Sequence, residues 1–281
     1  MAYTAGSTAV VTGAAGGIGR AIATRLVAEG FRVVLADLDP SVAETAGALG
    51  DSVVAAVVGD CASEAGVADL VAGAQQQLGH IDVFFANAGV EGGRGLEATE
   101  EQWARAIEVN VMAHVRAARL LVPTWLETGG GRLVVTASAA GLLTMLGSAP
   151  YSVSKHGAVA FAEWLRATYS HRGIVVQAIC PQGVRTRMLD DSGPLRDLLS
   201  RDRALEPSEV ADLVWEALQH ERFLVLPHPE VAGYYAARAS DPDAWLGAMG
   251  RLQAKLDAAL AADAEVAASA AASVAPSGSA W

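Results

Sequence analysis

The sequence has 281 residues, of which 52% are hydrophobic and 18% charged, and its formal net charge is −11 at pH 7. A chain of this length and composition can bury one large α/β core, and its negative charge argues against nucleic acid or an anionic membrane surface as a partner. The two cysteines, Cys61 and Cys180, are too few for a disulfide framework and favour a cytoplasmic protein.

The sequence lacks the signals of export, membrane insertion and metal binding. The first seven residues contain no basic segment followed by an apolar one, so we expect no signal peptide. The longest apolar runs are interrupted by Gly, Asp or Arg before the roughly 20 residues that a membrane span needs. The six histidines show no ligand spacing with acids or cysteines, so we expect packing or surface roles for them and no metal site.

Seven short apolar runs predict β-strands. They lie at residues 9–11, 32–35, 53–58, 81–85, 132–135, 174–179 and 222–226. Helix-like stretches follow most of them, at 19–29, 63–78, 100–127, 151–170 and 208–220. Because near-continuous apolar strands need cover on both faces, this alternation predicts an α/β fold, a doubly wound parallel sheet between helices.

Two segments depart from this alternation. Residues 186–206 are charged and contain Gly and Pro, which predicts a loop. Beyond a catalytic domain of residues 1–230, residues 231–264 predict a helical extension, and the Ala/Ser-rich residues 265–281 predict a flexible tail. Within the extension an apolar stripe recurs at steps of three and four, so we expect it to pack on the core or on a neighbouring subunit. Its members are Trp245, Met249, Leu252, Leu256 and Leu260.

A glycine-rich turn lies between the first strand and the first helix. It contains Gly13, Gly17, Ile18 and Gly19, spaced as T-G-x-x-x-G-I-G. Glycines in such a turn let the backbone approach a pyrophosphate, whose charge the helix N-terminus then stabilises. The alternative is an ordinary glycine-rich turn in a glycine-rich chain.

Asp37 ends the second strand, about 20 residues after these glycines. A carboxylate at that place can accept hydrogen bonds from both hydroxyls of the adenosine ribose, and it would repel a 2′-phosphate. The position therefore favours NAD over NADP. The alternative is an acid that caps a helix before Pro40, a role that suits Asp39 better.

Further small or polar residues follow the next two strands. Asp60 and Cys61 come after the third strand, where they would lie near the adenine. Asn87, Ala88 and Gly89 come after the fourth, where small residues leave room for a cofactor. Since ligands of open α/β sheets bind at the carboxyl ends of the strands, we expect all five beside the cofactor.

Tyr151, Lys155 and Ser138 predict the chemistry. Tyr151 and Lys155 are four residues apart and share a helix face. An ammonium beside a phenol stabilises the phenolate, so we expect the pKa of Tyr151 to lie below its usual ~10 and Tyr151 to act as a general acid/base. Ser138, at the end of the fifth strand, could hydrogen-bond the substrate oxygen.

The combined T-G-x-x-x-G-x-G, N-A-G, Ser and Y-x-x-x-K pattern resembles the single-domain branch of the short-chain dehydrogenase/reductase family, over roughly residues 7–227. The resemblance implies a Rossmann-type fold, proton transfer by Tyr151, and contact between Lys155 and the nicotinamide ribose. It also implies that Ser138 orients the carbonyl or hydroxyl of a substrate. Members of the family are commonly dimers or tetramers, so we expect a homo-oligomer, up to a homotetramer.

The resemblance extends to two further segments. Asn110 matches an asparagine that positions a water in the family's proton relay. Pro181, Val184 and Thr186 match a nicotinamide-contacting turn, but Gln182 stands where glycine is usual. If that place requires a positive φ, either Gln182 is strained or the turn moves to Gly183.

The leading hypothesis is an NAD-dependent oxidoreductase that interconverts a small secondary alcohol and its ketone, with Tyr151 as the acid/base. The segments expected to line the pocket, 90–96, 139–150 and 188–199, carry few charges, which favours an apolar or aromatic substrate. The alternative is a non-catalytic nucleotide sensor or scaffold. A scaffold has no need of Asn110, Ser138, Tyr151 and Lys155 together.

Overall fold

The computed structural model describes residues 3–191 and 202–274, with side chains in the last helix described to residue 258 and at residue 261. The strands are β1 (Thr8–Thr12), β2 (Arg32–Asp37), β3 (Val53–Val58), β4 (Val83–Ala86), β5 (Gly131–Thr136), β6 (Ile174–Ile179) and β7 (Leu224–Val225). The α-helices are α1 (Gly17–Ala28), α2 (Val42–Leu49), α3 (Glu64–Leu78), α4 (Glu100–Ile107), α5 (Ala113–Thr128), α6 (Ala149–Tyr169), α7 (Arg187–Asp190), α9 (Pro207–Leu218), α10 (Glu230–Ser240) and α11 (Pro242–Val274).

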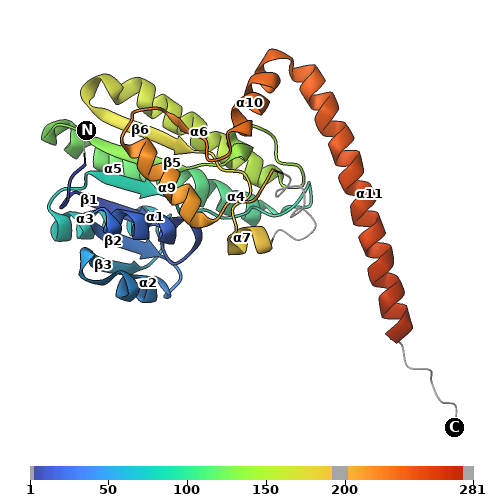
Figure 1. Cartoon of the computed structure of the whole chain (residues 1–281), viewed down its shortest axis with the longest axis horizontal. Helices are drawn as coiled ribbons and strands as arrows, with labels where there is room; N and C mark the ends of the chain where they lie inside the picture. Colours follow the sequence, from blue (N-terminus) through green and yellow to red (C-terminus); the bar gives the residue numbers. More distant parts are fainter. Residues whose placement is uncertain (1–2, 192–201, 275–281) are drawn as a thin grey trace, which may run out of the picture. The chain divides into compact units, whose positions relative to one another are not determined.

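The seven strands form one parallel sheet in the order β3-β2-β1-β4-β5-β6-β7, as Figure 1 shows. In the register of the central strands, Val10 of β1 lies opposite Val34 of β2 and Phe84 of β4. The chain winds outward from β1 in one direction to β3, then crosses back to β4 and continues to β7. The predicted doubly wound sheet is therefore confirmed, and its topological switch point lies between β1 and β4.

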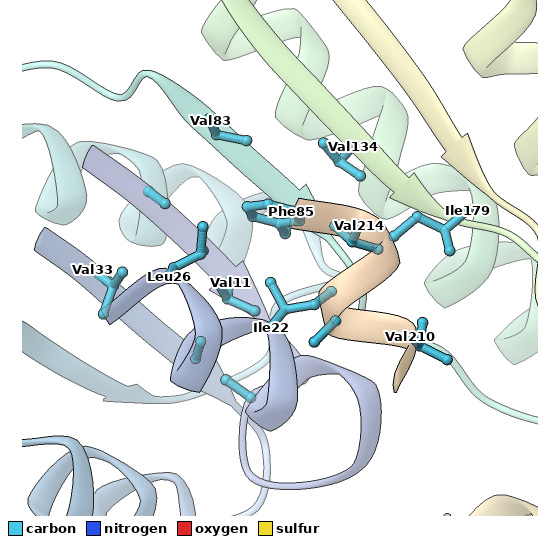
Figure 2. Close-up of a cluster of buried hydrophobic side chains, with 14 of the residues drawn as sticks. Val11, Ile22, Leu26, Val33, Val83, Phe85, Val134, Ile179, Val210 and Val214 are labelled. Carbon is cyan, nitrogen blue, oxygen red and sulfur yellow. The ribbon is translucent and has the colours of Figure 1, made fainter. Parts of the chain in front are cut away.

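Helices cover both faces of the sheet. On one face α1 and α9 lie side by side and bury aliphatic side chains against the strands (Figure 2). The cluster includes Ile22 and Leu26 from α1, Val210 and Val214 from α9, and Val11, Val33, Phe85, Val134 and Ile179 from the sheet. On the other face α3 packs on α5, and α5 and α6 contact the strands. This two-sided cover explains why the strands are mainly apolar on both faces.

The stretch 100–127, predicted as a single helix, contains a π-helical turn. Helix α4 begins at a capping box in which the Thr99 and Gln102 side chains and backbone amides bond reciprocally. After Ile107 the backbone widens into the π turn Glu108–Met112 and then continues as α5. Such a turn accommodates one extra residue and often occurs at functional sites. Here it contains Asn110, which is fully buried.

The segment after β6 that was predicted as a loop contains the short helix α7, and the chain then returns to lie beside residue 184. Val184 and Leu205 form an isolated parallel bridge, in which Leu205 donates its amide to the Gly183 carbonyl at 3.1 Å. Residues 192–201 lie outside the described residues.

The chain divides into two compact units, residues 1–232 and 233–281. In the second unit α11 continues to Val274, ten residues beyond residue 264, where the sequence predicted the helical extension to end and a flexible tail to begin. Alanine has the highest helix propensity, and residues 265–274 contain neither Gly nor Pro, so the local sequence favours continuation of the helix. Residues 275–281 lie outside the described residues, and docking of the apolar stripe stays a prediction.

Within the ranges 3–191 and 202–274, no helix combines the length and the apolar character that crossing a membrane requires.

The first testable prediction concerns the start of β5. Trp125 of α5 is buried and donates its indole N–H to the Ile81 carbonyl at 2.7 Å. A Cβ atom added at Gly131 would lie 2.3 Å from atoms of that indole ring. We expect Gly131→Ala to lower the free energy of unfolding by ~1–3 kcal/mol, as overpacking of a core does, measured by urea denaturation.

Gly73→Ala in α3 is the matched control, because a Cβ there meets nothing within 4 Å. It should leave stability unchanged or raise it by up to ~1 kcal/mol, since alanine is the better helix former. A Gly131→Ala protein as stable as the wild type would disprove the packing argument.

Candidate functional site

The candidate site lies at the carboxyl ends of the central strands, next to the switch point. Ser138 follows β5, while Tyr151 and Lys155 lie in the first two turns of α6. The structure brings these three side chains together, as their hydrogen bonds and mutual electrostatic effects indicate. Helix α6 packs directly on the 3-10 turn that follows Ser138, which brings the serine close to the two residues of the helix.

Ser138 is buried and forms the N-cap of a 3-10 turn, Ala139–Gly141. Its hydroxyl oxygen accepts a hydrogen bond from the Ala140 amide at 3.1 Å, and the hydroxyl lies 3.4 Å from the Pro181 carbonyl. A hydrogen bond also links Ser138 to Tyr151. The capped turn therefore fixes the serine hydroxyl beside the phenol, where both can reach one substrate oxygen.

Lys155 is buried with its ammonium group directed at the end of β5. Its Nζ donates to the Thr136 carbonyl at 2.9 Å and lies 5.7 Å from the centre of the Tyr151 ring. Burial lowers the pKa of Lys155 to about 8, and only Cys180 acts in the opposite direction. The lysine is therefore ready to lose its charge a little above neutral pH.

The prediction that Lys155 lowers the pKa of Tyr151 was wrong for this structure. Burial raises the pKa of Tyr151 to about 12, against the lowering effect of the hydrogen bond with Ser138. Glu91 and Cys180 add smaller raising effects because their negative charge opposes a phenolate. Lys155, with a pKa of about 8, is already neutral at the pH where Tyr151 ionises, so it does not offset the desolvation of the phenolate.

Asn110 has a structural role through its side chain. Its Oδ1 accepts from the Val90 amide at 2.9 Å, and its Nδ2 donates to the Val90 carbonyl and to Ser154 Oγ, each at 2.9 Å. The amide thus ties the loop after β4 to α6 and has both its protons engaged. Its Oδ1, which accepts one bond here, keeps a second lone pair, so the expected role of Asn110 in holding a water stays a prediction.

The glycine-rich turn is tightly wound, and its glycines let the backbone pass close to neighbouring segments. Gly13 and Gly17 adopt φ values of +66° and +52°. A Cβ at Gly13 would lie 2.9 Å from the Ala88 Cα, and one at Gly19 would lie 2.1 Å from the Gly13 carbonyl oxygen. Helix α1 then begins with Ile18 in its first turn, no acid there, and no side chain capping its amides. The turn and this helix end fit a bound phosphate group.

Asp37 faces the glycine-rich turn and caps no helix. Its Oδ2 accepts from the Ala15 amide and its Oδ1 from the Asp39 amide, both at 2.9 Å. Asp39 in turn accepts from the Ser41 amide at 2.9 Å, where α2 begins. The capping alternative therefore fits Asp39, and Asp37 lies where the sequence analysis expected a ribose-binding carboxylate.

Asp60 and Cys61 lie near Asp37. The Asp60 carboxylate accepts from the Ala62 amide at 2.9 Å, and this bond is the main cause of its lowered pKa. Burial, with contributions from Asp37 and Asp60, raises the pKa of Cys61 to about 12. Cys61 is therefore a partly buried thiol beside Asp37 and Asp60, and its raised pKa keeps it protonated near neutral pH.

Asn87 holds strands together. Its Nδ2 donates to the Thr12 carbonyl at 3.0 Å and lies 3.3 Å from the Gly13 carbonyl, and its Oδ1 accepts from Thr136 Oγ1 at 2.9 Å. Thr12 Oγ1 in turn accepts from the amides of Asn87 and Ala88. At Gly89 a Cβ would lie 3.2 Å from Asn110 Oδ1 and 3.3 Å from Lys155 Nζ, so glycine lets the chain pass close to both side chains, and the expected space beside a cofactor stays a prediction.

Both alternatives for the turn after β6 were wrong. Neither Gln182 nor Gly183 has a positive φ. Gln182 is accommodated because its backbone, in an ordinary conformation, donates its amide to His228 Nδ1 at 3.1 Å. Thr186 lies close to the glycine-rich turn, with its Cγ2 3.1 Å from where a Gly17 Cβ would be, and Pro181 accepts from the Ala139 amide at 2.8 Å.

Sequence reasoning missed several residues that shape the site. Thr12 and Ser154 each bond a residue that it did identify, Asn87 and Asn110. Glu91 lies in the segment 90–96 that was expected to line the pocket, but its effect on the pKa of Tyr151 was not foreseen. Thr12 could have been found from its place directly before Gly13, whereas the partners of Ser154 and Glu91 are set by tertiary contacts alone. No group of acids, histidines and cysteines suited to a metal occurs among the described residues.

Comparison with known proteins identifies the family. Its sequence model, described as short chain dehydrogenase, matches residues 7–196. The chain is 38% identical to 1-deoxy-11-beta-hydroxypentalenate dehydrogenase of Streptomyces exfoliatus over 229 residues, which cover 79% of this chain and 83% of that protein. It is 31% identical to levodione reductase of Leifsonia aquatica over 190 residues, 65% of this chain and 71% of that protein.

A solved structure agrees with these relatives. A short-chain dehydrogenase/reductase from Burkholderia phymatum, in complex with NAD, superposes with a TM-score of 0.80 at 30% identity, and the match covers 86% of this chain and 96% of that one. A sequence match over more than half of the chain and a shared sheet topology lead to one assignment. The protein is an enzyme of the short-chain dehydrogenase/reductase family.

Proposed function

We propose that the protein oxidises a small secondary alcohol to a ketone with NAD, or reduces the ketone with NADH, using Tyr151 as the proton-transfer group. The observation that carries the proposal is the cluster of Ser138, Tyr151 and Lys155 at the carboxyl ends of the strands, next to the glycine-rich turn. The relatives named after a hydroxy compound and a dione support the reaction class.

Tyr151 and Ser138 would handle the substrate oxygen. In ketone reduction the Tyr151 hydroxyl donates its proton to the carbonyl oxygen, while the Ser138 hydroxyl hydrogen-bonds the same atom and stabilises the developing charge. In alcohol oxidation the deprotonated Tyr151 accepts the hydroxyl proton. Because its pKa is about 12 in this structure, Tyr151 is held as an acid near neutral pH. Oxidation should therefore depend more steeply on rising pH than reduction does.

The nicotinamide would supply the acceptor or donor of the hydride. Lys155 would hold its ribose, and the Pro181–Thr186 turn would lie against the ring. The glycine-rich turn and the start of α1 would hold the pyrophosphate, and Asp37 the adenosine ribose. One feature of Asp37 and one of its neighbour support NAD over NADP. Asp37 carries a negative charge where a 2′-phosphate would lie, and its neighbour Leu38 is exposed and uncharged.

The substrate is proposed to be apolar or aromatic near its carbinol. Residues 90–96 and 139–150 supply mainly small and aliphatic side chains next to Ser138 and Tyr151. Glu91 is an acid that lies near Tyr151, and burial raises its pKa against the lowering effect of Arg94. A site with few fixed charges fits an apolar ligand.

Self-association is proposed as well. Leu120 on α5 and Val153 and Trp164 on α6 expose large apolar surface, with Trp164 56% exposed. Such surface is common at interfaces between subunits.

The second testable prediction concerns Tyr151. Tyr151→Phe removes the transferable proton and keeps the ring, so kcat should fall by ~10²–10⁴-fold while NADH binding stays within a few-fold of the wild type. Steady-state kinetics over a panel of secondary alcohols and ketones, together with NADH fluorescence titration, measure both quantities. Tyr169→Phe, at the end of α6, is the matched control and should retain activity. A wild-type protein that binds NADH without turnover on the whole panel would favour a nucleotide sensor.

The third prediction concerns the choice of cofactor. Asp37→Asn keeps an acceptor for the Ala15 amide but removes the charge, and Leu38→Arg adds a phosphate partner. The double variant should raise the NADP/NAD ratio of kcat/KM by ~10–10²-fold, since hydrogen bonds to charged groups contribute about 1.5–3 kcal/mol. Leu38→Gln is the control for the second position. An unchanged ratio would mean that Asp37 only supports the turn.

The fourth prediction concerns the cost of burying Lys155. Its pKa falls from 10.5 to about 8 on folding, so the unfolded chain binds the proton more tightly. The resulting penalty on the free energy of unfolding is full below pH 8. It disappears as the pH rises through 10.5. Lys155→Met should therefore stabilise the protein at pH 7 by ~2 kcal/mol, about 3 from the lost penalty less about 1 for the bond to Thr136.

This gain should vanish by pH 10, as followed by urea denaturation at both pH values. Lys255→Met, on the exposed surface of α11, changes the chain's other lysine and should show neither effect. A stability difference that does not change with pH would contradict the account.

A further inference from the structure

His228 lies just after β7, between Pro227 and Pro229, and is buried. Both nitrogens of its ring have backbone partners. Nδ1 accepts from the Gln182 amide at 3.1 Å, and Nε2 lies 3.2 Å from the Arg203 carbonyl oxygen. One imidazole therefore joins three segments that are distant in sequence: the turn after β6, the chain that returns before α9, and the chain that leaves β7.

The two bonds determine the protonation of the ring. A backbone amide can only donate, so Nδ1 must offer its lone pair to Gln182 and carries no proton. A carbonyl can only accept, so Nε2 must carry the proton that reaches Arg203. His228 is thus held as the neutral Nε2–H tautomer, and a second proton on Nδ1 would remove the acceptor of the Gln182 amide.

The turn that His228 holds is the one that faces the cofactor. On one side of Gln182, Pro181 accepts from the amide of Ala139, which directly follows Ser138. On the other side, Thr186 lies against Gly17 of the glycine-rich turn. A displacement at Gln182 would therefore be transmitted to both the candidate catalytic serine and the phosphate-binding turn.

The returning segment is anchored at the same place. Leu205 pairs with the Gly183 carbonyl and accepts from the Arg185 amide at 2.8 Å, and Arg185 forms an ion pair with Glu206 at 3.2 Å. These contacts hold the residues after the turn, but none of them engages the Gln182 amide. His228 supplies that bond, at the position where the family usually has glycine.

We propose that His228 is a positioning residue that, as the neutral Nε2–H tautomer, holds the cofactor-facing turn Pro181–Thr186 and the Arg203 carbonyl in the arrangement that binds the dinucleotide. This inference rests on the proposed use of the turn in NAD binding. It assigns to a histidine outside the predicted site the bond that holds the Gln182 amide.

The protonation of His228 should weaken this support on the acid side. Burial lowers the pKa of His228, so the neutral form is favoured in the folded protein. The charged groups that affect it are Asp202, Arg203 and Glu230, while the turn Pro181–Gly183 contributes no titratable side chain. Because a released imidazole takes up a proton below about pH 6.5, the arrangement is fully stable above that pH and is weakened as the pH falls below it.

The test compares His228→Leu, which loses both bonds, with His228→Gln, whose amide can accept from Gln182 and donate to Arg203 without titrating. NADH affinity is measured by fluorescence from pH 5 to 8. At pH 7.5 we expect the Leu variant to bind NADH about tenfold more weakly and the Gln variant to bind within about threefold of the wild type, since a hydrogen bond contributes about 0.5–1.5 kcal/mol. Below about pH 6.5 the NADH affinity of the Gln variant should fall less than that of the wild type.

A second measurement does not depend on the cofactor. Hydrogen exchange of peptides that span residues 181–186 reports directly on the Gln182 amide, and it should be faster in the Leu variant than in the wild type or the Gln variant. His171→Gln, at an exposed histidine, is the matched control and should change neither quantity. If the Leu variant does not fold, the pH profile and exchange of the Gln variant decide the question.

Two outcomes would overturn the proposal. One is a Leu variant whose turn exchanges no faster than that of the wild type. The other is a Gln variant whose acid-side loss of affinity equals that of the wild type. A wild-type protein that binds no NADH would instead contradict the proposed function, while the exchange comparison would still test whether His228 holds the turn.

Discussion

The structure depends on a small hydrogen-bond network that joins the carboxyl ends of three strands. Asn87 bonds the Thr12 and Gly13 carbonyls at the end of β1 and the Thr136 hydroxyl at the end of β5, while Thr12 returns a bond to β4. Parallel strands leave polar backbone groups open at their ends, and these groups must find partners. Because the network satisfies them with side chains, the glycine-rich turn and the residues after β5 keep fixed positions relative to one another.

The electrostatic character of the site comes from two ionisable side chains that lie beside these strand ends. Lys155 is buried and Tyr151 half-buried beside the end of β5, and desolvation lowers the pKa of Lys155 and raises that of Tyr151, which favours the neutral form of each. The protein thereby gives up stability to hold two ionisable groups away from water, as active sites commonly do. A polar, positively charged nicotinamide placed beside them would change that balance, so acid/base behaviour is expected to depend on whether the site is filled.

Much of the fold could be predicted from the sequence because the signals were local. Each of the seven strands lies within about two residues of its predicted run, and the glycine spacing located the start of α1. The π turn at Asn110 could not be predicted in this way, since apolar periodicity over residues 100–127 fits a continuous helix. The side-chain bonds of Asn110 to Val90 and Ser154 arise only after three segments have packed together.

The same distinction applies to the site. Ser138, Tyr151 and Lys155 could be predicted because their residue types and spacing imply a chemistry, whereas the pKa of Tyr151 depends on how much water the fold excludes. Gln182 looked strained because only its own position was considered. Its φ is in fact ordinary, and its amide bonds an imidazole 46 residues away in the chain, a contact that no pattern within the turn indicates.

The π turn has one more consequence. A single residue advances an α-helix by roughly 100°, and a π turn adds one residue to the winding. Loss of any one residue from Glu108–Met112 could restore a regular helix and still leave every remaining side chain unaltered. It would leave α4 and α5 in phase, because the extra residue is accommodated within the turn, but it would close the widened turn that places Asn110 beside Val90. The site therefore depends on the length of this segment as well as on its composition. Substitutions keep that length, so only a deletion would reveal the dependence.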